Sequence, residues 1–369
     1  MTPSLHPIPG GEHKLYDPAD PATPAHGSEL LDPSAVLRNG QWTLFSAGQA
    51  HCFGPPNLFS ATLPPGAPLS PSGWTVARDP SGELLPVASG DRSAPWDAGG
   101  GRHCPSYVCG VDPATNRPIE RIYYAGAADH IGGPYSIGYL EWDGERWLDQ
   151  PEPAFLAAEP WEHDSVYEPN LLFHDGLWKL WYVAGANRDD YLVHGYAESP
   201  DGRSNWKRTI FAPPEMKMFD FCVRPHRGAF AAVFTRVSVR GQAPPEAGLW
   251  WCTAPAPSGR LADWGQPLQI MSATDRGWHT GPFKPSLAFD PSAPDKARVF
   301  FAGSYNTGEP GPSPSPLPPA PSSSPSWSRF RHPERAAESA IPPPRISPVS
   351  PQSSLTPAPI APKLVHTFP

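Results

Sequence analysis

The sequence has few charged residues and no strongly basic segment. Of its 369 residues, 17% are charged, and the formal net charge is −8. A nucleic-acid-binding protein needs a basic face, so this balance argues against that class of partner. No run of about 18 apolar residues is present, and we therefore expect no membrane span. The first 17 residues lack a basic stretch followed by an apolar one, so we expect no secretory signal and a cytoplasmic protein.

Motifs that mark the common metal, nucleotide and hydrolase sites are also missing. The sequence contains no HExxH, no Walker loop, no GxSxG and no Cys/His pairs at metal-ligand spacing, so we predict no metal and no cofactor. Five cysteines, an odd number without a CxxC, indicate buried free thiols in a reducing compartment, and the alternatives are disulfides or a metal site. The five cysteines are Cys52, Cys104, Cys109, Cys222 and Cys252. Sustained helical periodicity is absent between residues 30 and 309, which favours an all-β fold.

Proline and aromatic residues are abundant instead. There are 55 prolines, with 14 Trp, 11 Tyr and 16 Phe to build a core. The prolines gather at the C-terminus, where serine fills much of the remaining sequence, and such a composition cannot bury enough apolar surface to fold. We therefore divide the chain into an N-terminal arm (1–28) with one strand near His13–Tyr16, a globular part (29–309) and a disordered tail (310–369).

The clearest local pattern runs from Tyr167 to Gly185. It starts with the pair Glu168-Pro169, continues as a short apolar strand, turns at His174-Asp175-Gly176 and returns as the aromatic strand Leu177–Val183. An Asp-Gly between two such runs is a strong signal for a β-hairpin. This segment therefore predicts two antiparallel strands that begin at an acidic residue.

The same pattern recurs at intervals of roughly 55–70 residues, which is a period typical of radial β-architectures. The other copies open at Asp32-Pro33, Cys104-Pro105, Asp220-Phe221 and Lys284-Pro285. Third strands are predicted around three similar segments, namely Ala77–Gly82, Ala197–Gly202 and Ala254–Gly259. Four strands in each of five units predict a five-bladed β-propeller, and the alternative is a β-sandwich with coincidental hairpins.

The fifth unit is predicted to be incomplete. Its second strand ends near Gly303, and the proline-rich tail follows where two further strands should come. A blade without these strands leaves an open sheet edge, which is a site for aggregation. One hypothesis is that the tail arises from a shifted reading frame or a mis-joined exon, and the alternative is a natural linker.

In a propeller the first strand of each blade lines the central channel, so the residues that open these strands converge. We call them the ring residues: Asp32, Cys104, Glu168, Asp220 (or its neighbour Phe221) and Lys284. Asp32 and Glu168 then face each other across a pocket. Paired carboxyl groups, one acting as an acid and one as a base or nucleophile, are what glycoside hydrolysis requires. The alternative is that each acid caps a turn.

The openings of blades one and three resemble those of five-bladed propeller glycosidases, chiefly glycoside hydrolase families 43 and 32. The resemblance is carried by Asp32-Pro-Ser-Ala-Val, by Glu168-Pro-Asn-Leu-Leu with its Asp-Gly-Leu-Trp-Lys-Leu-Trp-Tyr return, and by Ala197-Glu-Ser-Pro-Asp-Gly. The resemblance to family 43 implies that Asp32 is the general base and Glu168 the general acid. It also implies a second-blade aspartate that raises the pKa of the acid.

The second blade departs from that pattern, because Ser106 stands where the family has aspartate. Besides the two catalytic acids, we predict six residues that contact a carbohydrate substrate: Ser106, Tyr107, Asp220, Arg224, His279 and Lys284. Two alternatives to a hydrolase remain open. One is a phosphorylase similar to family 130, with Arg102, Arg224 and Lys284 as possible phosphate ligands. The other is a non-catalytic carbohydrate-binding propeller, which Ser106 in place of the acid and the incomplete fifth blade both favour.

Overall fold

The strands of this chain pair into antiparallel sheets of four strands each. The computed structural model describes residues 13–16, 29–49, 55–67, 73–88, 96–130, 133–185, 192–236, 246–273, 278–289, 293, 296–305 and 363–368. These residues all belong to one compact unit of the chain. No helix in this part of the chain is long and apolar enough to cross a membrane.

Five sheets, which we call blades 1 to 5, follow one another along the sequence. Blade 1 contains β2 (Glu29–Arg38), β3 (Gln41–Gln49), β4 (Asn57–Leu63) and β5 (Thr75–Val76). Blade 2 contains β6 (Gly101–Val111), β7 (Pro118–Ala127), β8 (Tyr135–Trp142) and β9 (Trp147–Asp149). Blade 3 contains β10 (Val166–His174), β11 (Leu177–Ala184), β12 (Val193–Ser199) and β13 (Lys207–Ala212). Blade 4 contains β14 (Met218–His226), β15 (Ala229–Arg236), β16 (Gly248–Ala254) and β17 (Leu268–Ser272). Blade 5 contains β18 (Trp278–Phe289), β19 (Ala297–Tyr305), β20 (Lys363–Phe368) and β1 (His13–Tyr16).

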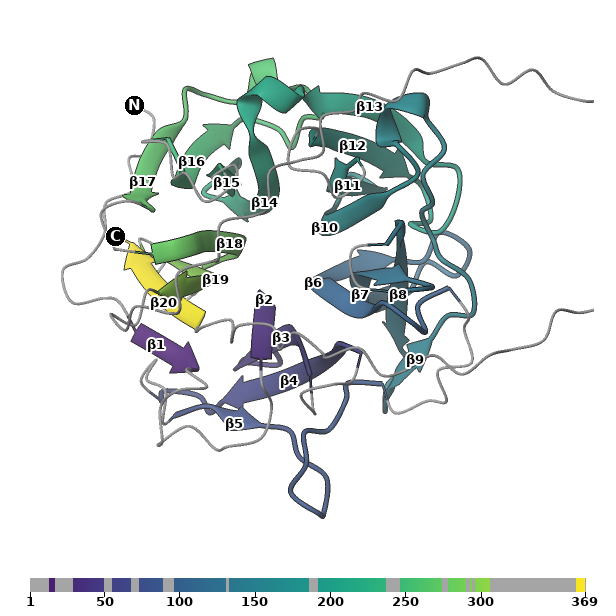
Figure 1. Cartoon of the computed structure of the whole chain (residues 1–369), viewed down its shortest axis with the longest axis vertical. Coiled ribbons are helices and arrows are strands. Elements are labelled where there is room, and N and C mark those ends of the chain that lie inside the picture. Colours follow the sequence, from purple (N-terminus) through teal and green to yellow (C-terminus); the bar gives the residue numbers. More distant parts are fainter. Residues whose placement is uncertain are drawn as a thin grey trace, which may run out of the picture. The chain divides into compact units, whose positions relative to one another are not determined.

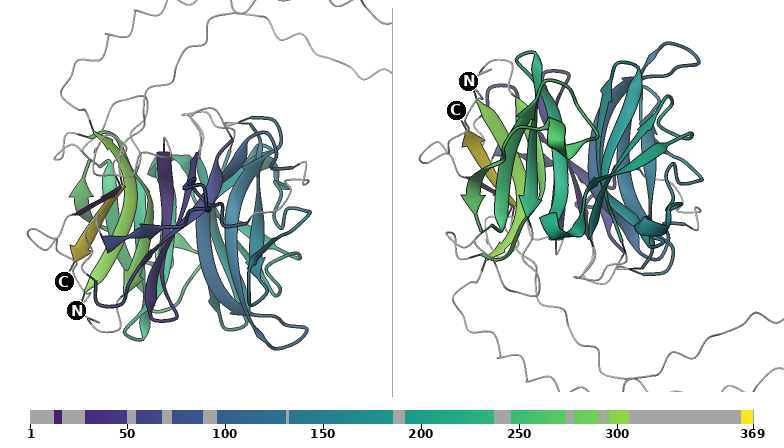
Figure 2. Two further views of the ribbon diagram at one scale, coloured as in Figure 1. Left: turned by 90° about the horizontal axis from the view of Figure 1, so that it is seen from below. Right: turned by 90° about the horizontal axis from the view of Figure 1, so that it is seen from above.

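The five blades surround a central axis, and the first strand of each blade lies nearest to it (Figure 1). The innermost strands contact one another in the order β2, β6, β10, β14 and β18, and β18 closes the circle on β2. Seen from the side, the innermost strands run along this axis (Figure 2). The predicted all-β fold with five propeller blades is therefore confirmed.

Each gap between neighbouring blades is filled by its own cluster of buried apolar side chains. Phe45 of blade 1 stacks on Tyr107 of blade 2, and Trp181 of blade 3 packs against Phe221 of blade 4. The remaining gaps hold Tyr123 with Trp178, Trp251 with Leu287, and Trp42 with Phe300. Because each large apolar side chain contributes about 1.5–3 kcal/mol when it is fully buried, the aromatic residues hold the blades together.

Tight turns explain why the hairpins were visible in the sequence. Asn39 and Gly40 have φ angles of 51° and 74°, and Asp175 and Gly176 have the same two values. A two-residue type I′ turn requires positive φ at both central positions, which asparagine, aspartate and glycine accept most readily. The turn residues therefore fix the register of the two inner strands in blades 1 and 3.

The fifth blade is complete, which corrects the prediction that its outer strands are missing. β20 pairs with β19 along its whole length, and β1 pairs with the other edge of β20. The strand expected at His13–Tyr16 is confirmed, whereas the expectation that nothing in 310–369 folds is wrong for Lys363–Phe368. Residues 306–362 lie outside the described part of the chain, so the reading-frame hypothesis stays a prediction.

Two smaller expectations have different outcomes. Ala77–Gly82 was expected to belong to a third strand, but it follows β5, which is the fourth strand of blade 1. Its sequence similarity to Ala197–Gly202 therefore does not reflect an equivalent place in the fold. The four cysteines within the described residues are free thiols; Cys104, Cys222 and Cys252 are buried, as predicted, whereas Cys109 is exposed. Cys52 lies outside the described residues.

Candidate functional site

A β-bulge near the start of each innermost strand builds the candidate site. The ring residues Asp32, Cys104, Glu168 and Lys284 each precede a proline at this bulge. Their φ angles are 52°, 54°, 53° and 46°, in the left-handed region. Proline has no N–H to contribute to the sheet, so a bulge is a site where it is tolerated. A left-handed conformation costs about 1–3 kcal/mol per non-glycine residue, and such strain gathers at functional sites.

Blade 4 lacks this proline, and its bulge differs. Asp220 occupies the position in β14 that Glu168 occupies in β10. The next residue, Phe221, still pairs with β15, so the bulge of blade 4 lies one residue closer to the start of its strand. Asp220 is not among the described residues with positive φ. Its side chain nevertheless joins the others, so Asp220 rather than Phe221 is the ring residue of blade 4.

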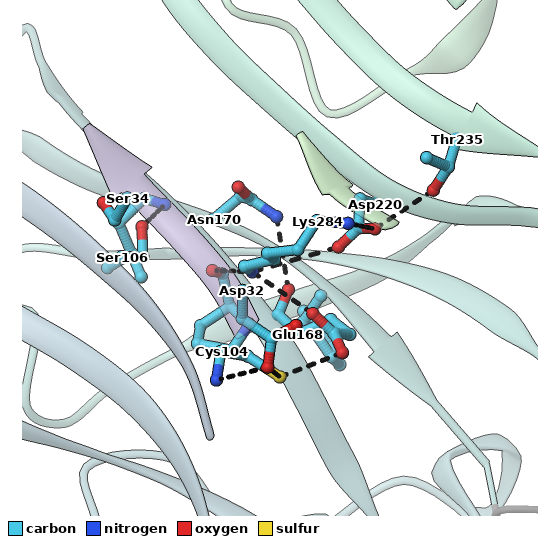
Figure 3. A network of polar contacts seen from close by, with 12 residues as sticks. Asp32, Ser34, Cys104, Ser106, Glu168, Asn170, Asp220, Thr235 and Lys284 are labelled. Carbon is cyan, nitrogen blue, oxygen red and sulfur yellow. Dashed lines mark hydrogen bonds and ion pairs between the residues drawn. The ribbon is translucent and has the colours of Figure 1, made fainter. Parts of the chain in front are cut away.

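The five ring residues form one polar cluster at the centre of the propeller (Figure 3). The Cys104 thiol donates to Glu168 Oε1 at 2.9 Å and lies 3.5 Å from Asp32 Oδ2. Because one sulfur contacts both carboxyl groups, these two oxygens lie no more than 6.4 Å apart, the sum of the two distances. The predicted pair of acids from blades 1 and 3 therefore does converge, with a thiol between them.

The Lys284 ammonium lies on the other side of Glu168. Its Nζ is 3.4 Å from Glu168 Oε2 and 3.9 Å from Asp220 Oδ1, and it donates to the backbone oxygen of Pro169 at 2.7 Å. Asp220 is held from two directions, since its Oδ2 accepts from the Lys284 N–H at 2.8 Å and from Thr235 Oγ1 at 3.0 Å. The cluster thus joins blades 3, 4 and 5 through charged groups.

Burial decides the protonation of this cluster. Glu168, Asp220, Lys284 and Cys104 are 6%, 0%, 1% and 5% exposed, whereas Asp32 is only half-buried. Burial raises the pKa of Glu168 well above its usual range, the Asp220 carboxylate raises it further, and the Lys284 ammonium partly opposes both effects. Burial also raises the pKa of Asp220, against the opposing effect of Lys284. Of the two buried carboxyl groups, Glu168 is therefore the one better suited to hold a proton.

The lysine and the cysteine keep their protons as well. Burial lowers the pKa of Lys284, but the carboxylates of Glu168 and Asp220 more than offset this, and the net shift is upward. Burial raises the pKa of the Cys104 thiol, and the neighbouring Asp32 and Glu168 raise it further. The site therefore contains an ammonium and a neutral thiol, and a neutral thiol is a poor nucleophile.

Aromatic side chains lie along the same level of the propeller. His103, Tyr167, Phe219 and Phe283 each directly precede a ring residue, and with Tyr135 they form a chain of neighbouring rings. The ring centroids are 5.6–6.1 Å apart along this chain. Phe219 and Phe283 are half-buried rather than buried. The ring residues of blades 2 to 5 are therefore bordered by an aromatic arc.

Two of the predicted substrate contacts lie outside the cluster. Ser106 is buried, and its Oγ accepts the backbone N–H of Leu171 at 3.0 Å, so it ties blade 2 to blade 3. Tyr107 packs against Phe45 between blades 1 and 2, and its hydroxyl donates to Glu120 at 2.7 Å. Both side chains have structural partners, and their contact with a substrate stays a prediction.

The basic residues behave differently from one another. Lys284 belongs to the cluster, as expected, together with Asp220. Arg224 donates to the backbone oxygen of Val223 and makes no described contact with the ring residues. Arg102 is 1% exposed and forms ion pairs with Asp97 and Asp149, so it is engaged elsewhere. His279 lies in β18, and its side chain is outside the described part of the structure.

Sequence reasoning missed two contributors to the site. Cys104 was placed in the ring but given no role, although its thiol joins the two candidate catalytic acids. Thr235, near the end of β15, fixes the orientation of Asp220. Its only signal in the sequence is its position at the end of a return strand. Among the described residues, no group of three or more His, Cys, Asp or Glu side chains is arranged to hold a metal ion.

Comparisons with known proteins show what this architecture resembles. No family model and no curated protein matches the sequence. A thermostable family-43 glycoside hydrolase has a TM-score of 0.52 and 14% identity, over 75% of this chain and 84% of that one. The catalytic domain of the GH62 α-L-arabinofuranosidase from Coprinopsis cinerea has a TM-score of 0.54 and 10% identity, over 99% and 97% of the two chains. The α-L-arabinofuranosidase PaAbf62A from Podospora anserina, solved with cellotriose, has a TM-score of 0.52 and 13% identity, over 83% and 92%. The chain therefore has a fold similar to that of propeller glycoside hydrolases.

Proposed function

We propose that this propeller is a glycoside hydrolase in which Glu168 is the general acid and Asp32 the general base. One observation carries the proposal: the Cys104 thiol joins Glu168, a buried carboxyl group with a raised pKa, to the more exposed carboxyl group of Asp32. A general acid with a raised pKa beside a second carboxyl group is the arrangement that glycoside hydrolysis uses. The similarity of fold to glycosidases supports the same reaction class.

The roles of the two acids follow from their surroundings. Glu168 has desolvation and a neighbouring carboxylate to hold its proton, so it is suited to protonate a leaving-group oxygen. Asp32 is half-buried and faces the same thiol from the other side, so it is suited to accept a proton from water. If Asp32 acts on water, the product forms with inversion at the anomeric carbon, whereas a separation of the two acids below 6.4 Å would also suit Asp32 as a nucleophile, with retention. Proton NMR of the first-formed anomer measures this, and retention would contradict the role proposed for Asp32.

The substrate is proposed to be a glycan that stacks on the aromatic arc. Aromatic faces bind apolar faces of ligands, and this arc borders the ring residues in blades 2 to 5. Two of the proteins with a similar fold are α-L-arabinofuranosidases. Arabinofuranosides are therefore the first substrates to test, followed by xylosides, fructosides, mannosides and galactosides.

The decisive experiment compares aryl glycosides with good and poor leaving groups. Glu168→Gln is expected to lower kcat/KM about 10²–10⁴-fold for a poor leaving group and far less for a good one, because a good leaving group needs no acid. Asp32→Asn is expected to lower kcat/KM by a similar factor for both substrates. Glu120→Gln, a half-buried glutamate outside the ring, is the matched control. Full activity in both ring variants would end the proposal.

Adding inorganic phosphate tests the phosphorylase alternative in the same assay. Of the three basic residues considered for phosphate, Lys284 and Arg102 are ion-paired with carboxylates, and Arg224 makes no described contact with the ring. We therefore expect turnover without phosphate and no sugar phosphate among the products. A sugar phosphate would support the phosphorylase, and binding of a glycan without turnover would support the non-catalytic propeller.

A further inference from the structure

The charges in the ring do not balance without an extra proton. Asp32, Glu168 and Asp220 are three acids, and Lys284 is the one cation among the ring residues. Glu168 Oε2 and Asp220 Oδ1 are both buried, and within the described part of the chain neither accepts a hydrogen bond. An unsatisfied buried carboxylate oxygen is costly, and two of them around the same ammonium require an explanation.

The ammonium alone does not satisfy these two oxygens. Its distances of 3.4 Å to Glu168 and 3.9 Å to Asp220 are longer than an N–H···O hydrogen bond, which ends near 3.2 Å. Its one short contact, at 2.7 Å, is with the Pro169 carbonyl. Both oxygens thus face one ammonium that bonds to neither, and interaction with the Glu168 side chain lowers the pKa of Asp220. If one of the two acids carries a proton, its O–H can donate a hydrogen bond to the oxygen of the other acid. Both oxygens then have a hydrogen-bond partner.

We propose that Glu168 and Asp220 share one proton, and that Asp220 of blade 4 is the positioning residue that keeps this proton on Glu168. The negative charge stays on Asp220 because its Oδ2 accepts two hydrogen bonds, from the Lys284 N–H and from Thr235. Among the described residues, the Glu168 carboxyl accepts a hydrogen bond from the weak thiol donor of Cys104 alone. Hydrogen bonds to the ionised form favour that form, so the acid that accepts more hydrogen bonds is the one that ionises.

Asp220 can supply the negative charge that the second blade lacks. The resemblance to family 43 places the acid that tunes Glu168 in blade 2, where this chain has Ser106. The Ser106 Oγ is used by the Leu171 N–H and carries no charge. Asp220 supplies the missing negative charge from the opposite side of Glu168. The catalytic consequence rests on the proposed hydrolase, whereas the shared proton itself is a property of the folded protein.

A carboxyl titration that needs no substrate tests the proposal. Protein labelled with ¹³C at glutamate Cδ gives a Glu168 signal that is assigned by its loss in Glu168→Gln. In the wild type we expect this signal to remain protonated at neutral pH. In Asp220→Asn we expect its midpoint to fall by about one pH unit or more, because the neighbouring negative charge is gone. The proposal would be overturned if Glu168 is ionised at neutral pH in the wild type. It would also be overturned if the Glu168 midpoint is the same in Asp220→Asn as in the wild type.

Two further variants keep the result interpretable. Asp97→Asn neutralises another aspartate that is 0% exposed, ion-paired with Arg102 and hydrogen-bonded to Tyr124, but outside the ring. It should leave the Glu168 midpoint unchanged, and an equal shift would overturn a specific role for Asp220. If Asp220→Asn does not fold, Thr235→Val removes one hydrogen bond from Asp220 and keeps both acids. The Glu168 signal should then move toward its ionised position, and no movement would count against the shared proton.

The pH dependence of kcat/KM separates this proposal from the proposed function. In Asp220→Asn the basic limb, which reports loss of the Glu168 proton, should move to lower pH by the same amount as the titration. If the enzyme is active and Asp220→Asn changes neither the basic limb of kcat/KM nor the Glu168 midpoint, the proposed hydrolase stands and the shared proton is refuted. If the protein is inactive but the Glu168 midpoint falls in Asp220→Asn, the shared proton stands and the proposed hydrolase is refuted.

Discussion

Replacing Lys284 with methionine is expected to make stability depend strongly on pH. The side chain is 1% exposed, and it faces Glu168 and Asp220 while its Nζ donates to the Pro169 carbonyl. Removing one partner from a buried ionic group leaves the other uncompensated, at a cost of about 3–5 kcal/mol. We therefore expect Lys284→Met to lower the free energy of unfolding by about this amount near pH 8.

The sign of the pH dependence follows from the two acids. The pKa values of Glu168 and Asp220 are raised in the folded protein, and the Lys284 ammonium opposes both shifts. Without the ammonium both values rise further above their unfolded values of about 4.3 and 3.9. A raised carboxyl pKa contributes stability that is present below the unfolded pKa and lost as pH rises through the folded pKa. The deficit of the variant should grow from about pH 5 to about pH 8, by up to ~1.4 kcal/mol per pH unit for each extra proton held.

Urea unfolding at several pH values measures this effect, with Lys179→Met as the control. Lys179 is also buried and ion-paired, with Glu198, whose side chain is 32% exposed. Burial raises the pKa of Glu198, but hydrogen bonds from Lys179 and Tyr196 outweigh it, and the net shift is downward. Such a pair loses its contribution only in acid, so the control deficit should stay near 1 kcal/mol and flat over this range. A Lys284→Met deficit that is equally flat would refute the reasoning.

Three other perturbations have defined outcomes. Cys104→Ala removes a hydrogen bond that lowers the pKa of Glu168, so the basic limb of kcat/KM should move to higher pH by as much as about one unit. This direction is opposite to that expected for Asp220→Asn. Cys104→Ser keeps a hydrogen-bond donor and should leave the basic limb unchanged. Ser286→Ala leaves the buried Ala35 N–H without its acceptor and should cost about 1–3 kcal/mol in urea unfolding; no loss would mean that the tie between blades 5 and 1 is not needed. Deleting 363–369 exposes the edge of β19 and removes the partner of β1. The Tm should therefore fall, and light scattering should reveal aggregation. A monomer with an unchanged Tm would contradict the closed fifth blade.

The inner hairpins could be predicted because their information is local. Asn39-Gly40 and Asp175-Gly176 specify tight turns, and the aromatic return strands fill the gaps between blades. The closure of blade 5 could not be predicted in the same way. β1 and β20 lie at opposite ends of the chain, each is short, and no turn joins either to its neighbour in the sheet. Pairing over such a distance leaves no periodic signal in a single sequence.

The candidate site was predicted in its ring but not in its chemistry. The position before proline located Asp32, Glu168 and Lys284, because the bulge that accepts the proline also turns those side chains toward the axis. The position after proline pointed to Ser106 as a substrate contact, and the sequence did not show that its hydroxyl accepts the Leu171 N–H. Which oxygen accepts which hydrogen depends on distances of a few tenths of an ångström, and spacing along a sequence does not carry that information.

Stability alone does not account for the ring. Four of its residues adopt left-handed φ angles, and the carboxyl groups of Glu168 and Asp220 have raised pKa values, so each feature costs free energy at neutral pH. Buried ionic clusters are often no more stable than apolar residues of similar size. The same propeller holds its blades together elsewhere with aromatic clusters and with neutral ties such as Ser34 to the Tyr107 N–H. Strain and shifted protonation are therefore concentrated where one carboxyl group is kept protonated beside others, which is what acid/base chemistry at this position requires.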